Sequence, residues 1–162
     1  MLKKLSFALI LLVCLGGCKS KTALNYNEDF VKKETALGPD IESTDTKVSA
    51  YITSEQWDSI AIAGERMEKL VDAVVKEIKD KPAPDVKEGQ NFKEAGIRYF
   101  EYMKSMYSLY KAYGLESTPE GRAAQLERLR ELIGNKKLEI DHIQEAQKKF
   151  ADANGFRIEK KE

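Results

Sequence analysis

Apolar residues recur at alternating three- and four-residue steps through most of the chain, which is the spacing of one face of an α-helix. Four stretches show this pattern, from about Tyr26 to Tyr51, Trp57 to Ile78, Glu88 to Tyr113 and Pro119 to Asn154. No stretch shows the two-residue alternation of a half-buried strand. The sequence therefore predicts an all-α protein with four amphipathic helices.

The first stretch is interrupted by Gly38-Pro39, because proline removes a helical hydrogen bond and clashes with the preceding turn. Its apolar stripe nevertheless keeps the same phase on both sides, with Glu34 and Thr44 filling two of the stripe positions. The stripe residues are Phe30, Leu37, Ile41, Val48 and Tyr51. This favours one kinked helix, and a loose segment up to Asp45 remains the alternative.

The second stretch has the most regular stripe, consisting of Trp57, Ile60, Gly64, Met67, Val71, Val74 and Ile78. Gly64 lies within the stripe, where the lack of a side chain permits close approach of a neighbouring helix. Thr53 and Gln56 have the spacing of a capping box, which predicts the helix start. Pro82 and Pro84 predict its end.

The third and fourth stretches are separated by Gly114 and by Thr118-Pro119, which predict a helix end and a helix start. Gly134-Asn135 predicts a bend within the fourth. The third stripe consists of Phe92, Gly96, Tyr99, Met103, Met106, Tyr110 and Tyr113, and the fourth of Leu126, Leu129, Ile133, Ile140, Ile143 and Phe150. Short links require antiparallel neighbours, so we expect an up-down-up-down four-helix bundle over residues 25–158.

A targeting signal precedes the helical pattern. Lys3 and Lys4 are followed by an apolar run, Leu5 to Leu15, that is too short to span a bilayer of about 30 Å but has the length of a signal-peptide core. A plain secretory signal needs no cysteine at its end. Here the run ends in Leu15-Gly16-Gly17-Cys18, which is typical of a bacterial lipobox.

We therefore interpret residues 1–17 as a cleaved lipoprotein signal peptide and Cys18 as the lipidated first residue of the mature chain. Leu15, Gly16 and Gly17 would be read by the processing enzyme. Lys19 in the next position favours the outer membrane over retention in the inner membrane. Residues 18–24 are polar and short, and we expect them to form an extended tether of about 20 Å.

Composition supports an ordered body and excludes several functions. The chain has 33% charged and 42% hydrophobic residues, with 27 basic and 27 acidic side chains, so it lacks the basic excess of a nucleic-acid-binding protein. Cys14 would leave with the signal peptide. The mature body would then contain no free thiol and no disulfide.

Catalytic and metal-binding patterns are weak. His142 is the only histidine and follows Glu139 at a Glu-x-x-His spacing, but a ferritin-like site needs two such elements and two further glutamates. We expect an exposed polar pair, no metal and no cofactor. No Gly-x-Ser-x-Gly elbow and no glycine-rich phosphate loop occurs, which favours a protein that is not an enzyme.

The segment from Tyr99 to Tyr113 is rich in tyrosine and methionine. Most of these residues belong to the helix stripe and are expected in the core. Tyr102 and Tyr107 lie off the stripe, so we interpret them as a possible partner surface, since such side chains make adaptable contacts.

Several of these features occur together in one group of proteins. The chain resembles small bacterial surface lipoproteins with a helical-bundle body in its lipobox, in Tyr26-Asn27, in Phe92-Lys93-Glu94-Ala95 and in the run from Glu145 to Ala151. The resemblance implies an anchored helical protein and assigns no catalytic residue.

We therefore expect a non-enzymatic cell-envelope lipoprotein with a structural or protein-binding role. Its partners would be the lipid bilayer, through acylated Cys18, and a protein. The alternative is a periplasmic module that binds or senses a small ligand in the core or at one end of the bundle.

Overall fold

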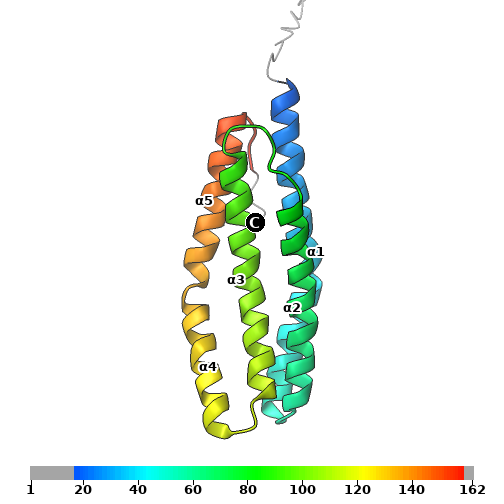
Figure 1. Cartoon of the computed structure of the whole chain (residues 1–162), viewed down its shortest axis with the longest axis vertical. Coiled ribbons are helices and arrows are strands. Elements are labelled where there is room, and N and C mark those ends of the chain that lie inside the picture. Colours follow the sequence, from blue (N-terminus) through cyan, green and yellow to red (C-terminus); the bar gives the residue numbers. More distant parts are fainter. Residues whose placement is uncertain (1–16, 159–162) are drawn as a thin grey trace, which may run out of the picture.

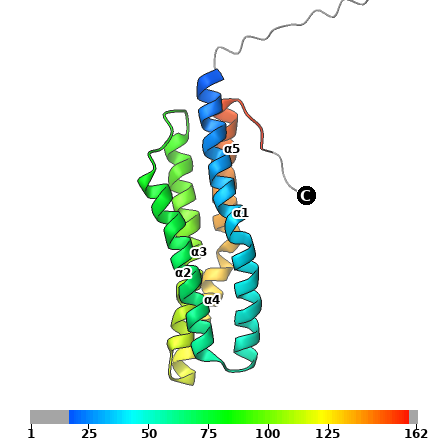
Figure 2. The same cartoon turned by 90° about the vertical axis from the view of Figure 1, so that its right-hand side faces the viewer.

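The computed structural model describes residues 17–158, and these form an elongated body of helices that lie side by side (Figure 1). The helices are α1 (Gly17–Thr53), α2 (Trp57–Asp80), α3 (Gly89–Leu115), α4 (Pro119–Gly134) and α5 (Lys136–Asn154). The chain turns back at each of the links 54–56, 81–88 and 116–118 (Figures 1 and 2). The expected all-α class is confirmed, and α4 with α5 corresponds to the fourth predicted helix, interrupted at Asn135.

Helix α1 is continuous through Gly38-Pro39, so the kinked helix is confirmed over the loose segment. Proline disfavours helical geometry in the preceding residue partly through that residue's Cβ, and Gly38 has none. Gly38, Pro39 and Thr35 are all exposed, so the carbonyl left without a partner one turn earlier lies on the solvent side. Figure 2 shows α1 bending near its middle.

The buried stripe of α1 begins earlier than predicted. Its buried residues are Ala23, Asn27, Phe30, Leu37, Thr44 and Val48. Residues 18–24, expected as an extended tether, instead form the first turns of the helix, and Ala23 is fully buried. The tether prediction is therefore wrong. Ala23 and Asn27 continue the three- and four-residue spacing of the buried stripe, but the polar residues around them hide this spacing in the sequence.

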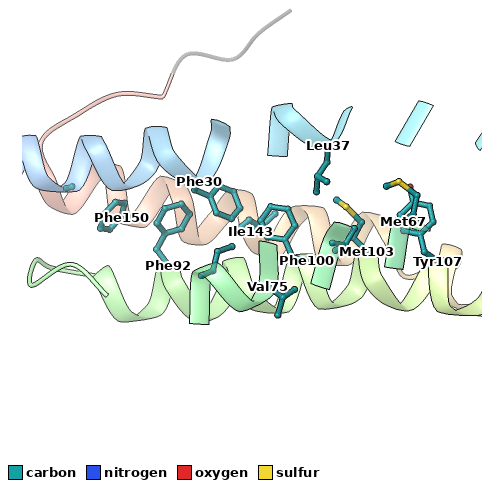
Figure 3. Close-up of a cluster of buried hydrophobic side chains, with 13 residues drawn as sticks. Phe30, Leu37, Met67, Val75, Phe92, Phe100, Met103, Tyr107, Ile143 and Phe150 are labelled. Atoms are coloured by element: carbon teal, nitrogen blue, oxygen red, sulfur yellow. The ribbon is translucent and has the colours of Figure 1, made fainter. Parts of the chain in front are cut away.

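Aromatic rings from three helices form the centre of the core (Figure 3). Phe92 of α3 and Phe150 of α5 stack with their centroids 4.9 Å apart and an interplanar angle of 24°. Phe30 of α1 lies 5.1 Å from Phe92 and 5.4 Å from Phe100, measured between ring centroids. Such ring pairs add to the free energy gained by burying their area, so this cluster holds α1, α3 and α5 together.

A second, smaller cluster lies where α2 begins and α3 ends. It contains Val48, Ile60 and Tyr113, with Trp57 packed edge-on against Tyr113 at a centroid distance of 5.7 Å. The guanidinium of Arg122 lies 4.5 Å from the Trp57 ring centroid. This cation–π contact links the side chain of Arg122 in the first turn of α4 to the start of α2.

Glycines bring α2 and α3 into backbone contact, as expected at Gly64. A Cβ placed on Gly64 would lie 2.5 Å from the backbone nitrogen of Lys111 and 2.9 Å from the carbonyl oxygen of Tyr107. A Cβ on Gly114 would meet the backbone of Ala61 and Trp57 at similarly forbidden distances. These two helices therefore pack at a separation that only glycine permits.

Replacing Gly64 by alanine is expected to lower the free energy of unfolding by about 1–3 kcal/mol, because the backbones of α2 and α3 must separate. The loss should occur although alanine is a better helix former than glycine by about 1 kcal/mol. Gly134→Ala is the matched control, since nothing lies within 4 Å of a Cβ there. Urea denaturation followed by circular dichroism measures both, and equal stabilities of the two variants would contradict the close contact.

The helix ends test two sequence signals. Thr118 caps α4 as predicted, because its hydroxyl oxygen accepts a hydrogen bond from the Gly121 backbone N–H at 3.0 Å. The prediction of a capping box between Thr53 and Gln56 at the start of α2 is wrong. Thr53 is instead the last residue of α1, and its hydroxyl donates to the carbonyl oxygen of Ser49 at 3.1 Å. The α1 stripe extends into this segment and overrides the local signal.

Candidate functional site

The predicted anchor lies at one end of the bundle. Leu15 and Gly16 lie outside the described residues, Gly17 is the exposed first residue of α1, and Cys18 follows it in the first turn. The side chain of Cys18 is also outside the described part. Ala23, the first buried residue, lies five positions further along the helix, or about 7.5 Å at 1.5 Å per residue. The proposed acylation site is thus only about one and a half turns from the packed core.

A recess lies beside these first turns of α1, between them, the 81–88 link and the end of α5. We call it the anchor-end recess; it has a volume of about 770 Å³. Its lining residues are Gly17, Lys19, Ser20, Lys21, Leu24, Lys87, Ala153, Asn154 and Gly155. The Asn154 side-chain amide donates to the carbonyl oxygens of Lys87, at 2.8 Å, and Phe150, at 2.7 Å. The bond to Lys87 fixes the 81–88 link to α5.

The two tyrosines of the predicted partner surface lie in different environments. Tyr107 is fully buried, in line with Met67 and Met103 in the core (Figure 3). Its burial raises the pKa of its hydroxyl. The prediction that Tyr107 contributes to a partner surface is therefore wrong. Helix α3 is packed against α2 on one side and against α1, α4 and α5 on others, so its buried face is wider than one stripe.

Tyr102 is half-buried, and its hydroxyl donates to the carbonyl oxygen of Leu132 at 2.9 Å. This bond joins α3 to α4 just before the break at Asn135. A partner contact through the remaining exposed part of Tyr102 stays a prediction. The structure gives Tyr102 a role in docking α4.

Two polar side chains on the inner face of α1, Glu34 and Asn27, are paired across helices. The Tyr99 hydroxyl donates to the Glu34 carboxylate at 2.8 Å, and burial raises the pKa of Tyr99. The Gln147 amide donates to the side-chain oxygen of buried Asn27 at 2.8 Å. The periodicity predicted that Glu34 lies in the apolar stripe of α1, and its hydrogen bond with Tyr99 explains how a carboxylate is accommodated there. The two hydrogen bonds join α1 to α3 and α5 and satisfy buried polar groups.

The Glu-x-x-His element serves a structural contact. The Arg98 guanidinium donates to both Glu139 carboxylate oxygens, at 2.7 and 2.6 Å, which joins α3 to α5. The Glu139 side chain is 11% exposed, so the expectation of an exposed pair is wrong for this residue. Between residues 17 and 158, no three histidine, cysteine or acidic side chains are grouped so that they could hold a metal ion.

The Arg98–Glu139 pair predicts a pH dependence of stability. The hydrogen bonds from Arg98 hold the pKa of Glu139 below its ordinary value of 4.5. The charged carboxylate therefore stabilises the folded state above about pH 4.5, and this contribution is lost as the pH falls through the lowered pKa. Because Arg98 is 56% exposed, we expect Glu139→Gln to lower stability at pH 7 by less than about 1 kcal/mol.

The measurement is the free energy of unfolding of wild type and Glu139→Gln between pH 7 and about pH 3. The difference between them should shrink toward the acid end. Glu145→Gln is the comparison, because Lys149 also lowers the pKa of Glu145 but both side chains are 63% exposed, so its effect should be smaller. A wild-type advantage that is constant over this pH range would contradict the assignment.

Nothing within residues 17–158 is a helix with both the length and the apolar character needed to cross a membrane. No protein-family model, curated protein or solved structure matches the chain.

Proposed function

We propose that the protein is a lipid-anchored lipoprotein of the cell envelope, whose up-down-up-down four-helix body has a non-enzymatic structural or protein-binding role at the outer membrane. The observation that carries this proposal is Leu15-Gly16-Gly17-Cys18 at the end of a charged and then apolar leader. Residues 1–17 would be removed, and Cys18 would carry the acyl chains. The resemblance to small bacterial surface lipoproteins remains part of the proposal.

The position of α1 supports this arrangement. Because helix α1 begins at Gly17, the proposed lipid attachment site is the end of the longest helix rather than the end of a flexible stalk. Each buried acyl CH₂ group stabilises membrane association by about 0.8 kcal/mol, so two or more chains make an effectively permanent anchor. The body would then stand directly on the bilayer.

The alternative of a small-ligand module receives little support from the core. The partly open hollow beside Tyr26, Phe30 and Phe92, which Asp29 and several lysines also line, has a volume of about 10 Å³, close to the minimum for a single water molecule. A ligand in the core would have to open the aromatic cluster, whereas one at the end of the bundle could occupy the anchor-end recess. Thermal stabilisation by small apolar compounds would favour the alternative.

Protease treatment of intact cells, with and without permeabilisation of the outer membrane, tests the location. Degradation in intact cells would place the body on the cell surface, where host, matrix or neighbouring-cell partners are to be sought. Survival until permeabilisation would place it in the periplasm, with envelope partners. Recovery of the full-length chain, leader included, in the cytosolic fraction would overturn the proposal.

A further inference from the structure

Three lysines at the anchor end have no carboxylate partner in the described part of the chain. Lys19, Lys21 and Lys87 are exposed and line the anchor-end recess, and none of them forms an ion pair with another described residue. Some lysines elsewhere, such as Lys79 and Lys149, lie within 4 Å of a described carboxylate, whereas others, such as Lys47, do not. The ammonium groups of these three lysines at the anchor end are therefore not paired with a described carboxylate, although Asp85 and Glu88 lie in the same link as Lys87.

The recess is suited to anionic groups by its lining. Among its described lining residues none is acidic, and the exposed apolar side chain of Leu24 lies among the lysines. Three like charges around one hollow repel each other unless a counter-charge is present. An ammonium group is a strongly hydrated point charge that binds phosphate oxygens.

We propose that the anchor end, defined by Lys19, Lys21, Leu24 and Lys87, binds the anionic headgroups of a phospholipid bilayer. The lysines lie around the start of α1, and Lys19 and Lys21 follow Cys18 by one and three residues. Along a helix these steps correspond to about 1.5 and 4.5 Å. The direction from which the bilayer approaches rests on the proposed acylation of Cys18, whereas the charge complementarity does not.

The consequence is an orientation. Acyl chains alone would leave the body free to tilt, whereas headgroup contacts on both sides of the recess, from α1 and from the 81–88 link, would hold the bundle upright. Figure 1 shows this link and the start of α1 at the same end of the molecule. The opposite end, with the 54–56 and 116–118 links, would be the part presented away from the membrane.

The expected size of the effect follows from membrane electrostatics. A lysine near an anionic bilayer contributes about fivefold to the binding constant, and three contribute about a hundredfold when their contributions are additive. The attraction is screened within about 10 Å at 0.1 M salt, so binding should weaken steeply as salt is added. A purely apolar contact through Leu24 would not show this salt dependence.

The test uses residues 18–162 with Cys18→Ser, so that no acyl chain contributes. The clusters of buried side chains lie between Ala23 and Phe150, with Phe156 packed against them, so this chain retains them. Sedimentation with vesicles of phosphatidylcholine and phosphatidylglycerol is compared with vesicles of phosphatidylcholine alone. We expect binding only to the anionic vesicles, with a loss of about a hundredfold in the Lys19→Gln/Lys21→Gln/Lys87→Gln variant.

The matched control is Lys47→Gln/Lys69→Gln/Lys136→Gln, which removes the same charge from exposed lysines outside the anchor end. Equal loss in both triple variants would overturn the proposal, because it would show an effect of net charge alone. Absence of binding to anionic vesicles would also overturn it. Stabilisation of the wild-type chain against heat by inorganic phosphate, lost in the anchor-end variant, would indicate a site for free phosphate instead. None of these outcomes bears on whether Cys18 is acylated in cells, which is measured separately.

Discussion

Replacing Phe150 by alanine is expected to lower the free energy of unfolding by about 3–5 kcal/mol. The Phe150 side chain is completely buried and stacks on Phe92. It also meets Tyr26 and Phe156 edge-on, at centroid distances of 6.2 and 5.8 Å. Removing the ring would leave a cavity where α1, α3 and α5 meet, and such domains have only about 5–15 kcal/mol of total stability.

Leu138→Ala in the same helix is the control for this prediction. Leu138 is 50% exposed, so its removal should change the free energy of unfolding by at most about 0.5 kcal/mol. Urea titration of the two variants, followed by circular dichroism, measures the difference. A Phe150→Ala protein as stable as Leu138→Ala would show that the aromatic cluster is not what holds α5 to the bundle.

Replacing Cys18 by serine is expected to release the protein from the membrane. The thioether carrying the acyl chains cannot form on serine, and the body has no other described element long and apolar enough to insert. A single acyl chain gives only marginal binding, whereas two or more give a stable anchor. The measurement is the share of protein in the membrane pellet after a high-salt wash, which removes the electrostatic contribution of the lysines.

Cys14→Ser is the matched control, because Cys14 lies within the predicted leader and would be removed with it. This variant should remain in the membrane pellet like the wild type. If Cys18→Ser lost residues 1–17 and still remained there after the wash, an anchor other than the acylated cysteine would have to hold the protein.

The core could be predicted from the sequence where one side of a helix is buried. In α2 five of the seven predicted stripe residues are buried, namely Ile60, Gly64, Met67, Val71 and Ile78. Trp57 and Val74 are only partly buried, and Ala61 and Val75 are buried in addition. In α1 the polar residues Glu34 and Thr44, which were predicted to lie in the stripe, are half-buried and buried, respectively. A single-sided contact produces the three-four spacing that periodicity detects.

The prediction was weakest where several helices contact one. Helix α3 packs against the other four, so Tyr107 is buried although it lies off the predicted stripe. The partners of polar residues were also missed. Nothing in the sequence near Glu139 indicates that Arg98, forty-one residues earlier, supplies its counter-charge. Such pairings depend on the relative height of the helices, which the spacing of apolar residues leaves open.

The recess at the anchor end shows the same limit. Lys19 and Lys21 were visible as polar residues after the cysteine, but Lys87 joins them only because Asn154 holds the 81–88 link against the end of α5. Because residues 18–24 were expected to form an extended tether, Lys19 and Lys21 were not expected to lie close to the bundle. In the structure helix α1 includes both lysines, so they line the recess at the end of the bundle.

The central claim is that Cys18 is the acylated first residue of the mature protein, and the N-terminal tryptic peptide of the native protein tests it most directly. Trypsin cleaves after Lys19, so the account predicts the dipeptide Cys18-Lys19 with the added mass of a diacylglyceryl group or of three acyl chains. Mass spectrometry of the protein purified from its own membranes reads this mass. An unmodified Cys18, or a mature chain that still contains residues 1–17, would contradict the account.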